Sequence, residues 1–120
     1  MIPVGNSIWY SSENSIFRVS DDHKISNIPN SHTLTCERLT SNSWAVFSSG
    51  LDKLLCRFEE EKETQKATLP TKPLSLTCDE NHVYVLTLQS EMIIIDARTL
   101  ATKSSNKLKF DATAMEICGS

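Results

Sequence analysis

The chain has 120 residues, of which 39% are hydrophobic and 22% are charged, a balance that is ordinary for a globular protein and unlike the disordered and membrane classes. Its net charge is −3 and its lysines and arginines are scattered, which disfavours nucleic acid as a partner because phosphate binding needs a clustered basic face. The longest uninterrupted apolar run, residues 92–95, is far shorter than the roughly 20 residues that cross a bilayer, so no membrane partner is expected.

The N-terminus and the cysteines indicate a reducing compartment. Residues 1–5 contain neither the basic region nor the long apolar region of a secretory signal, so we expect a cytoplasmic or nuclear protein. Cysteines occupy positions 36, 56, 78 and 118 without a C-x-x-C pair, so neither a zinc site nor a disulfide framework is expected. We predict that these thiols are reduced and metal-free and that the protein needs no cofactor.

The first third of the chain predicts one hairpin and one further strand. Residues 7–10 and 16–19 have β-character, and residues 11–14 between them have the composition of a turn. Residues 24–28 form a short candidate strand, which the proline at position 29 ends.

The middle third repeats this arrangement after one additional strand. Residues 33–40 are rich in threonine and predict a strand, and residues 45–58 predict a second hairpin. The acidic residues 59–63 have no apolar stripe, so we interpret them as a solvated loop or an edge strand rather than a helix. Residues 64–69 predict a short outer strand.

The last third contains the clearest hairpin, residues 83–96, with its reversal expected at residues 89–91. Residues 74–77 predict a strand before it, and residues 103–106 are interpreted as a polar linker. Further β-character is predicted for residues 108–110 and 112–118.

The three hairpins recur with a period near 40 residues. The turn residues Glu13, Asp52 and Gln89 are separated by 39 and 37 residues, and four short strands per period are typical of β-propeller blades. We therefore predict an all-β fold, a partial β-propeller of about three four-stranded blades. The expected repeat units are residues 1–32, 33–70 and 71–111, with residues 112–120 starting a further blade. Because propellers have roughly four to eight blades, we expect this piece to belong to a longer chain or an oligomer.

Two segments resemble the WD40-repeat β-propeller family. Residues 49–59 are similar to its S-G-x-x-D-x-x-[IVL]-x-[IVL]-W-D segment, with Phe58 and Glu59 in place of Trp and Asp. Residues 95–100 resemble its W-D-x-x-T-G segment. No Gly-His dipeptide precedes an inner strand, so we expect the family's hydrogen-bonded tetrad of Asp, His, Ser or Thr, and Trp to be largely absent.

This resemblance implies a non-enzymatic scaffold that binds other proteins through loops on one side of the ring. The residues expected to contact a partner are Asn30, His32, Lys53, Lys72, His82 and Glu91. Residues 69–96 also resemble the C-terminal propeller of actin-interacting protein 1, which implies actin filaments or another cytoskeletal or regulatory complex as an alternative partner. A ligand-binding or enzymatic propeller is a further alternative, for which inward-facing polar residues would be Glu37, Arg38 and Glu116.

No catalytic residue is expected. His23, His32 and His82 fall in predicted loops or at strand edges, with no serine, cysteine or carboxylate at a diagnostic spacing. Asp52 and Asp96 occupy a turn and a strand end, where we expect their carboxylates to cap backbone N–H groups.

Overall fold

The computed structural model describes residues 1–88 and 90–107, which form twelve β-strands in three sheets. The strands are β1 (Ile2–Val4), β2 (Ser7–Ser12), β3 (Ser15–Val19), β4 (Ile25–Ile28), β5 (Cys36–Ser41), β6 (Val46–Gly50), β7 (Leu54–Glu59), β8 (Lys62–Thr68), β9 (Pro73–Cys78), β10 (His82–Thr87), β11 (Glu91–Asp96) and β12 (Thr102–Lys107). The expected all-β fold is confirmed, and within these ranges no helix long enough to span a membrane is found.

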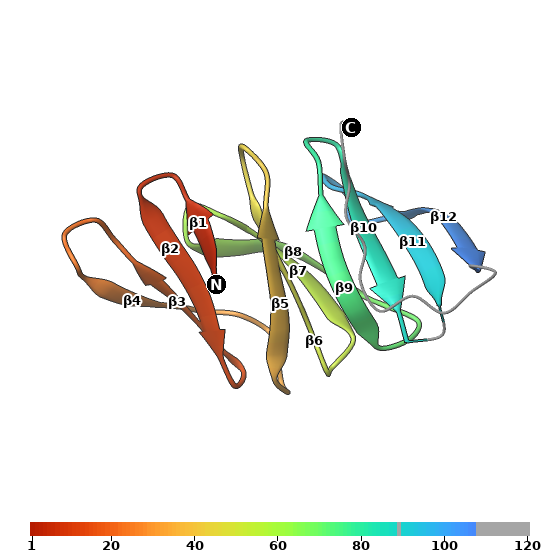
Figure 1. The fold of residues 1–120 in the computed structure, drawn as a ribbon, viewed down its shortest axis with the longest axis horizontal. Helices are drawn as coiled ribbons and strands as arrows, with labels where there is room; N and C mark the ends of the chain where they lie inside the picture. The colour runs from red at the N-terminus through yellow and green to blue at the C-terminus, as the bar shows by residue number, and fades with distance from the viewer. Residues whose placement is uncertain (89, 108–120) are drawn as a thin grey trace.

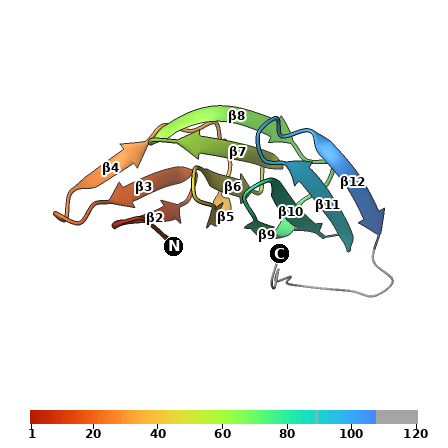
Figure 2. The ribbon, with the colours of Figure 1, turned by 90° about the horizontal axis from the view of Figure 1, so that it is seen from above.

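Each sheet is an antiparallel meander of four consecutive strands, and the three sheets stand side by side (Figure 1). We call β1–β4 blade 1, β5–β8 blade 2 and β9–β12 blade 3. Seen from above, the blades fan out along an arc, with β4, β8 and β12 on the outside and β5 and β9 on the inside (Figure 2). Three four-stranded blades are the predicted architecture, and each blade lies within one of the expected repeat units.

The hairpin at residues 83–96 forms as predicted. Residues 83–87 and 91–96 are in β10 and β11, paired with Val83 opposite Ile95. The turn between them contains Ser90 at a φ of 58°, and the corresponding turns of blades 1 and 2 contain Glu13 at 53° and Lys53 at 63°. The β6–β7 and β10–β11 turns share one geometry, with hydrogen bonds from Lys53 N to Gly50 O at 3.1 Å and from Ser90 N to Thr87 O at 3.0 Å, whereas the β2–β3 turn is one residue shorter.

Two hydrophobic cores lie between the blades. Trp9 and Ile16 of blade 1 pack with Phe58 of blade 2, and Phe47 of blade 2 belongs to the second core with Val83 of blade 3. Strand β6 is buried along its whole length because it has a neighbouring blade on each face. Strand β6 therefore shows no alternation of buried and exposed side chains.

Three strand predictions need correction. Residues 102–107 form β12, the outer strand of blade 3, although residues 103–106 were expected to be a linker. Residues 2–4, for which no strand was predicted, form β1, the inner strand of blade 1. Strand β5 begins at residue 36 instead of residue 33. The predictions for residues 108–110 and 112–118 lie outside the described residues.

The meanders give the molecule two loop-bearing faces at opposite ends of its strands. Consecutive turns of an antiparallel meander alternate between its two ends. We call one end the crossover face, which carries the β2–β3, β6–β7 and β10–β11 turns and the β4–β5 and β8–β9 crossovers between blades. The other end is the hairpin face, which carries the remaining turns within the blades. Hydrogen bonds from Leu69 N to Lys53 O at 2.7 Å and from Leu88 N to Lys72 O at 2.9 Å join turns and crossovers on the crossover face.

Candidate functional site: the two loop-bearing faces

A histidine, an aspartate and a serine form a buried hydrogen-bonded network beneath the crossover face of blade 2. His32 lies in the β4–β5 crossover, Ser48 on β6 and Asp52 in the β6–β7 turn. His32 Nδ1 is 3.1 and 3.0 Å from the two carboxylate oxygens of Asp52, and His32 Nε2 is 2.7 Å from Ser48 Oγ. Because a carboxylate only accepts, Nδ1 carries a proton, and in the neutral ring Nε2 then accepts a hydrogen bond from the serine hydroxyl.

The Asp52 carboxylate also ties the crossover to the turn. It accepts hydrogen bonds from Thr33 N at 2.8 Å and from Leu54 N at 3.1 Å. Burial of this carboxyl raises its pKa, but the hydrogen bonds from Leu54, His32 and Thr33 outweigh burial and hold the pKa below its usual value. The side chains of His32 and Asp52 are 0% and 4% exposed, so the network is closed to solvent.

Two cysteines lie in the core beside this network. Burial raises the pKa of the Cys36 thiol to about 11 and also raises that of Cys56. The thiolate is the reactive form of cysteine, so these thiols act as apolar packing groups between blades 1 and 2. Cys118 lies outside the described residues.

Four of the six residues expected to contact a partner lie on the crossover face. Lys53 is exposed in the β6–β7 turn, and Asn30, Lys72 and Glu91 are partly buried in or beside the neighbouring loops. Asn30 also shapes its own loop, because its Oδ1 accepts a hydrogen bond from the backbone N–H of His32 at 2.9 Å.

The other two expected contact residues are placed differently. The His32 side chain is buried and offers no surface to a partner. His82 begins β10 directly after the β9–β10 turn, so it belongs to the hairpin face, where its Nδ1 is 3.8 Å from Asp79 Oδ1. The expectation that these loops project from one side fails for His82 because β9–β10 and β10–β11 reverse at opposite ends of the blade.

On the hairpin face, the β5–β6 turn of blade 2 and the turns of blade 3 contact one another through side chains of both blades. The Glu80 carboxylate accepts hydrogen bonds from the backbone N–H of Ser43 at 3.0 Å and from the Ser43 hydroxyl. Trp44 Nε1 donates to Glu80 O at 3.0 Å, and the Arg98 guanidinium lies over the Trp44 ring at 4.4 Å from its centroid. These contacts fix the relative position of two adjacent blades at their loop ends.

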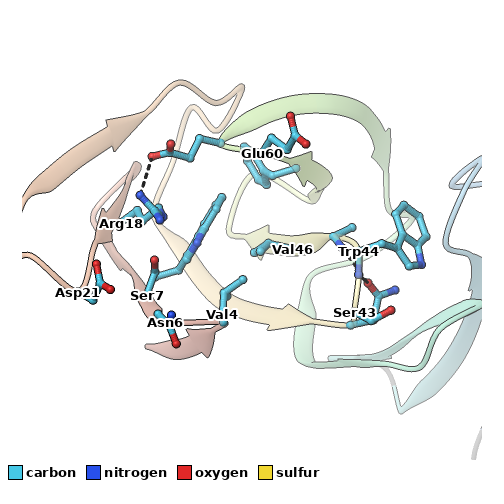
Figure 3. A pocket seen from close by; sticks show the side chains of 15 residues that line it. Val4, Asn6, Ser7, Arg18, Asp21, Ser43, Trp44, Val46 and Glu60 are labelled. Atoms are coloured by element: carbon cyan, nitrogen blue, oxygen red, sulfur yellow. Dashed lines mark hydrogen bonds and ion pairs between the residues drawn. The ribbon is translucent and has the colours of Figure 1, made fainter.

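A groove of about 590 Å³ opens between blades 1 and 2 at the hairpin face (Figure 3). Its buried wall contains Trp9, Val46 and Phe58, and the Trp9 and Phe58 rings are 5.9 Å apart. At its rim, Arg18 Nη1 is 3.8 Å from Glu61 Oε1. Sequence reasoning missed this groove, because its residues come from separate turns and no single motif contains them.

The inward-facing residues considered for a ligand-binding propeller do not form a cluster in the described part of the chain. Arg38 Nε donates a hydrogen bond to Leu74 O at 3.0 Å and thereby joins blades 2 and 3, while Glu37 is exposed. Glu116 lies outside the described residues. Within residues 1–88 and 90–107, no group of three or more His, Cys, Asp or Glu side chains is placed to hold a metal ion.

Solved structures of β-propellers contain the same arrangement of blades. The chain superposes on U3-55K with a TM-score of 0.76 and 13% identity, covering 85% of this chain and 36% of that one. It superposes on the WD40 repeats of RRP9 with a TM-score of 0.75 and 12% identity, covering 88% and 36%, and on Saccharomyces cerevisiae Sqt1 with a TM-score of 0.73 and 12% identity, covering 86% and 32%. This chain has the fold of WD40 β-propeller blades.

The similarity to these proteins is a similarity of fold, and it extends over only part of each of them. The chain spans about a third of the length of each structure that it matches. No protein-family model and no curated protein matches the sequence. None of the three structures named above supports the resemblance of residues 69–96 to the actin-interacting type.

The WD40-like fold explains the buried network. The family's tetrad of Asp, His, Ser or Thr, and Trp was expected to be largely absent, and this expectation is wrong for blade 2. Asp52, His32 and Ser48 supply three of its members, and Phe58 stands where Trp is usual. The signal present in the sequence was the segment Ser48-Ser49-Gly50-Leu51-Asp52, which contains both the serine and the aspartate of the network. The histidine was missed because Ser31, instead of glycine, precedes it.

The depressed pKa of Asp52 predicts a loss of stability in acid. Because the folded pKa lies below the unfolded value of about 3.9, this carboxylate stabilises the fold above that value, and the contribution is lost as the pH falls through the folded pKa. We expect the urea midpoint to be steady from pH 7 to about pH 5 and to fall below about pH 4. Asp52→Asn should flatten this profile without abolishing it, because the pKa values of Asp79 and Asp96 are also lowered. An unchanged acid profile in the variant would contradict the assignment.

Proposed function

We propose that this chain is a non-enzymatic protein–protein interaction scaffold of the WD40 type. The observation that carries the proposal is the closed state of the Asp52–His32–Ser48 network. Although these three groups have the order of a hydrolytic triad, His32 and Asp52 are 0% and 4% exposed and Ser48 is buried. A substrate cannot reach a serine in this position, and the network instead holds a loop of the crossover face in place.

A crossover-face loop that is held in place by this network is suited to binding a protein partner. A surface that is already ordered before binding loses less conformational entropy when a partner docks, so affinity is gained without additional contacts. The crossover face presents Lys53, Lys72 and Glu91 on loops that are joined to one another by backbone hydrogen bonds. The proposed partners are other proteins in the cytoplasm or nucleus, and the sequence resemblance supplies actin filaments as one named partner to test.

The crossover face can be tested with one matched pair of charge reversals. Lys53 and Lys62 are both exposed, and neither side chain makes an ion pair or hydrogen bond with the described residues. Lys53 lies on the crossover face, whereas Lys62 begins β8 beside the hairpin face. Partners are identified by crosslinking the 120-residue chain in cell extract and purified for titration, with actin filaments included in a co-sedimentation assay. We expect Lys53→Glu to weaken binding about tenfold, whereas Lys62→Glu should not weaken it.

Two results would contradict the scaffold proposal. One is that no purified protein, actin filaments included, binds the wild-type chain with a dissociation constant below about 100 μM. The other is ester hydrolysis by the wild-type chain that disappears in Ser48→Ala while the urea midpoint is retained, since this would show that the buried network is catalytic.

A further inference from the structure

The groove between blades 1 and 2 on the hairpin face has an unbalanced charge. The charged residues that line it are Arg18, Asp21, Glu60 and Glu61. Arg18 is paired with Glu61 at 3.8 Å, which leaves the carboxylates of Asp21 and Glu60. Both are exposed at the rim, and neither has a cationic partner among the described residues. The groove therefore has two carboxylates available to a ligand.

A serine in the wall of the groove provides a second, independent feature. Ser7 is 5% exposed and lines the groove, and none of the described residues hydrogen-bonds its hydroxyl group. Ser7 and Trp9 are two residues apart on β2, so both side chains face blade 2. Figure 3 shows Ser7 on the blade 1 side of the hollow, between Asp21 and Val46. The Ser7 hydroxyl is therefore free to hydrogen-bond a ligand in the groove.

The wall of the groove is apolar beneath this polar rim. Trp9 is 3% exposed, Val46 is 3% exposed and Phe58 is 1% exposed, and all three line the hollow. A volume of about 590 Å³ is within the range of sites that enclose small ligands. A ligand that fits must combine an apolar stem with a positively charged group that donates hydrogen bonds, and arginine and lysine side chains have this construction.

We propose that this groove binds a basic side chain, arginine above all, from a segment of a protein partner. The stem lies along Trp9 and Val46, and the guanidinium group donates hydrogen bonds to the Ser7 hydroxyl and to the Asp21 carboxylate on the blade 1 side. The Glu60 carboxylate on the blade 2 side adds a second negative charge to the groove (Figure 3). Arginine is favoured over lysine because its five N–H donors in a fixed plane can serve several separate acceptors. The inference rests on the proposed function in one respect, namely that the basic group belongs to a protein.

The test uses the 120-residue chain and two small probes. N-acetyl-arginine amide and N-acetyl-citrulline amide have nearly the same shape, but only the first is charged. In ¹H–¹⁵N spectra we expect arginine amide to shift the signals of residues 5–9 and 42–46 with a dissociation constant in the millimolar range, as is usual for so small a ligand. The citrulline probe should bind about tenfold more weakly. Equal binding of the two probes, or shifts that fall outside these segments, would overturn the assignment.

Variants separate the groove from the net charge of the protein. Asp21→Asn combined with Glu60→Gln should weaken arginine amide binding about tenfold, and Ser7→Ala should weaken it about fivefold. The matched control is Glu13→Gln combined with Glu37→Gln, which removes two exposed carboxylates outside the groove and should leave binding unchanged. Equal loss in the control pair would show that arginine amide responds to overall charge, and this would overturn the site.

The failure of this inference is distinguishable from the failure of the scaffold proposal. If the chain binds a purified partner but gives no localised shifts with arginine amide, the groove assignment is wrong and the scaffold proposal stands. If arginine amide binds the groove and the chain binds no protein, the scaffold proposal is wrong and the arginine site stands.

Discussion

Asp52→Ala is expected to lower the free energy of unfolding by about 3–5 kcal/mol, because several hydrogen bonds to its carboxylate are lost and each hydrogen bond to a charged group contributes about 1.5–3 kcal/mol. The substitution leaves the Nδ1–H of His32 without its acceptor in a site that water does not reach. It also removes the acceptor of the Thr33 and Leu54 N–H groups. Because a domain of this size is stable by about 5–15 kcal/mol in total, the variant should be close to unfolding at room temperature. Urea titration followed by tryptophan fluorescence measures the change.

Asp96→Ala is the matched control. Asp96 caps the β11–β12 turn as Asp52 caps its own, with Oδ1 accepting from the N–H groups of Arg98 and Thr99 at 2.8 and 3.0 Å. Its side chain is 26% exposed and has no histidine partner, so water can replace the lost acceptor. We expect a cost of about 1 kcal/mol. Equal costs for the two substitutions would show that Asp52 acts only as a turn cap and that the network adds nothing.

The hairpins of this fold are readable from the sequence because their information is local. Residues 45–58 and 83–96 each place a short polar turn between two apolar runs, and the strands follow these runs closely. The period near 40 residues then identifies blades, since a four-stranded sheet of this length must be repeated to bury its faces. The apolar runs, the polar turns between them and the repeat length all indicate the same fold.

Other features depend on contacts between distant residues and could not be read from the sequence. Strand β12, residues 102–107, contains no apolar side chain and has low β-propensity, but it pairs with β11 and is the outer strand of its blade. The position of His32 depends on Asp52 and Ser48, which lie 20 and 16 residues further along the chain. The groove with Ser7 and Asp21 forms only when two blades pack together.

Gly50→Ala is expected to destabilise the fold by about 3 kcal/mol, the upper range for overpacking in a well-packed site. Gly50 pairs with Cys36 at the end of β6. A Cβ atom at this position would lie 2.4 Å from Thr35 O and 3.0 Å from the Cα of Cys36. Both are backbone atoms, which cannot rotate away as the end of a side chain can. The start of β5 would have to move, and the hydrogen bond from Leu51 N to Thr35 O at 2.9 Å would lengthen.

The preceding residue provides the control, because Ser49→Ala should be neutral or stabilising by up to about 1 kcal/mol. The Ser49 hydroxyl is buried and has no hydrogen-bond partner among the described residues, so its removal relieves an unsatisfied polar group. The two adjacent substitutions both place alanine in β6 and should change the urea midpoint in different directions. A Gly50→Ala variant as stable as the wild type would show that β5 tolerates displacement here, and the glycine of the Ser-Gly-Leu-Asp segment would then have no steric role. If the midpoint falls as expected, displacement of β5 should also strain the Cys36 N to Glu13 O hydrogen bond, which is 2.8 Å long and joins blade 2 to the β2–β3 turn of blade 1.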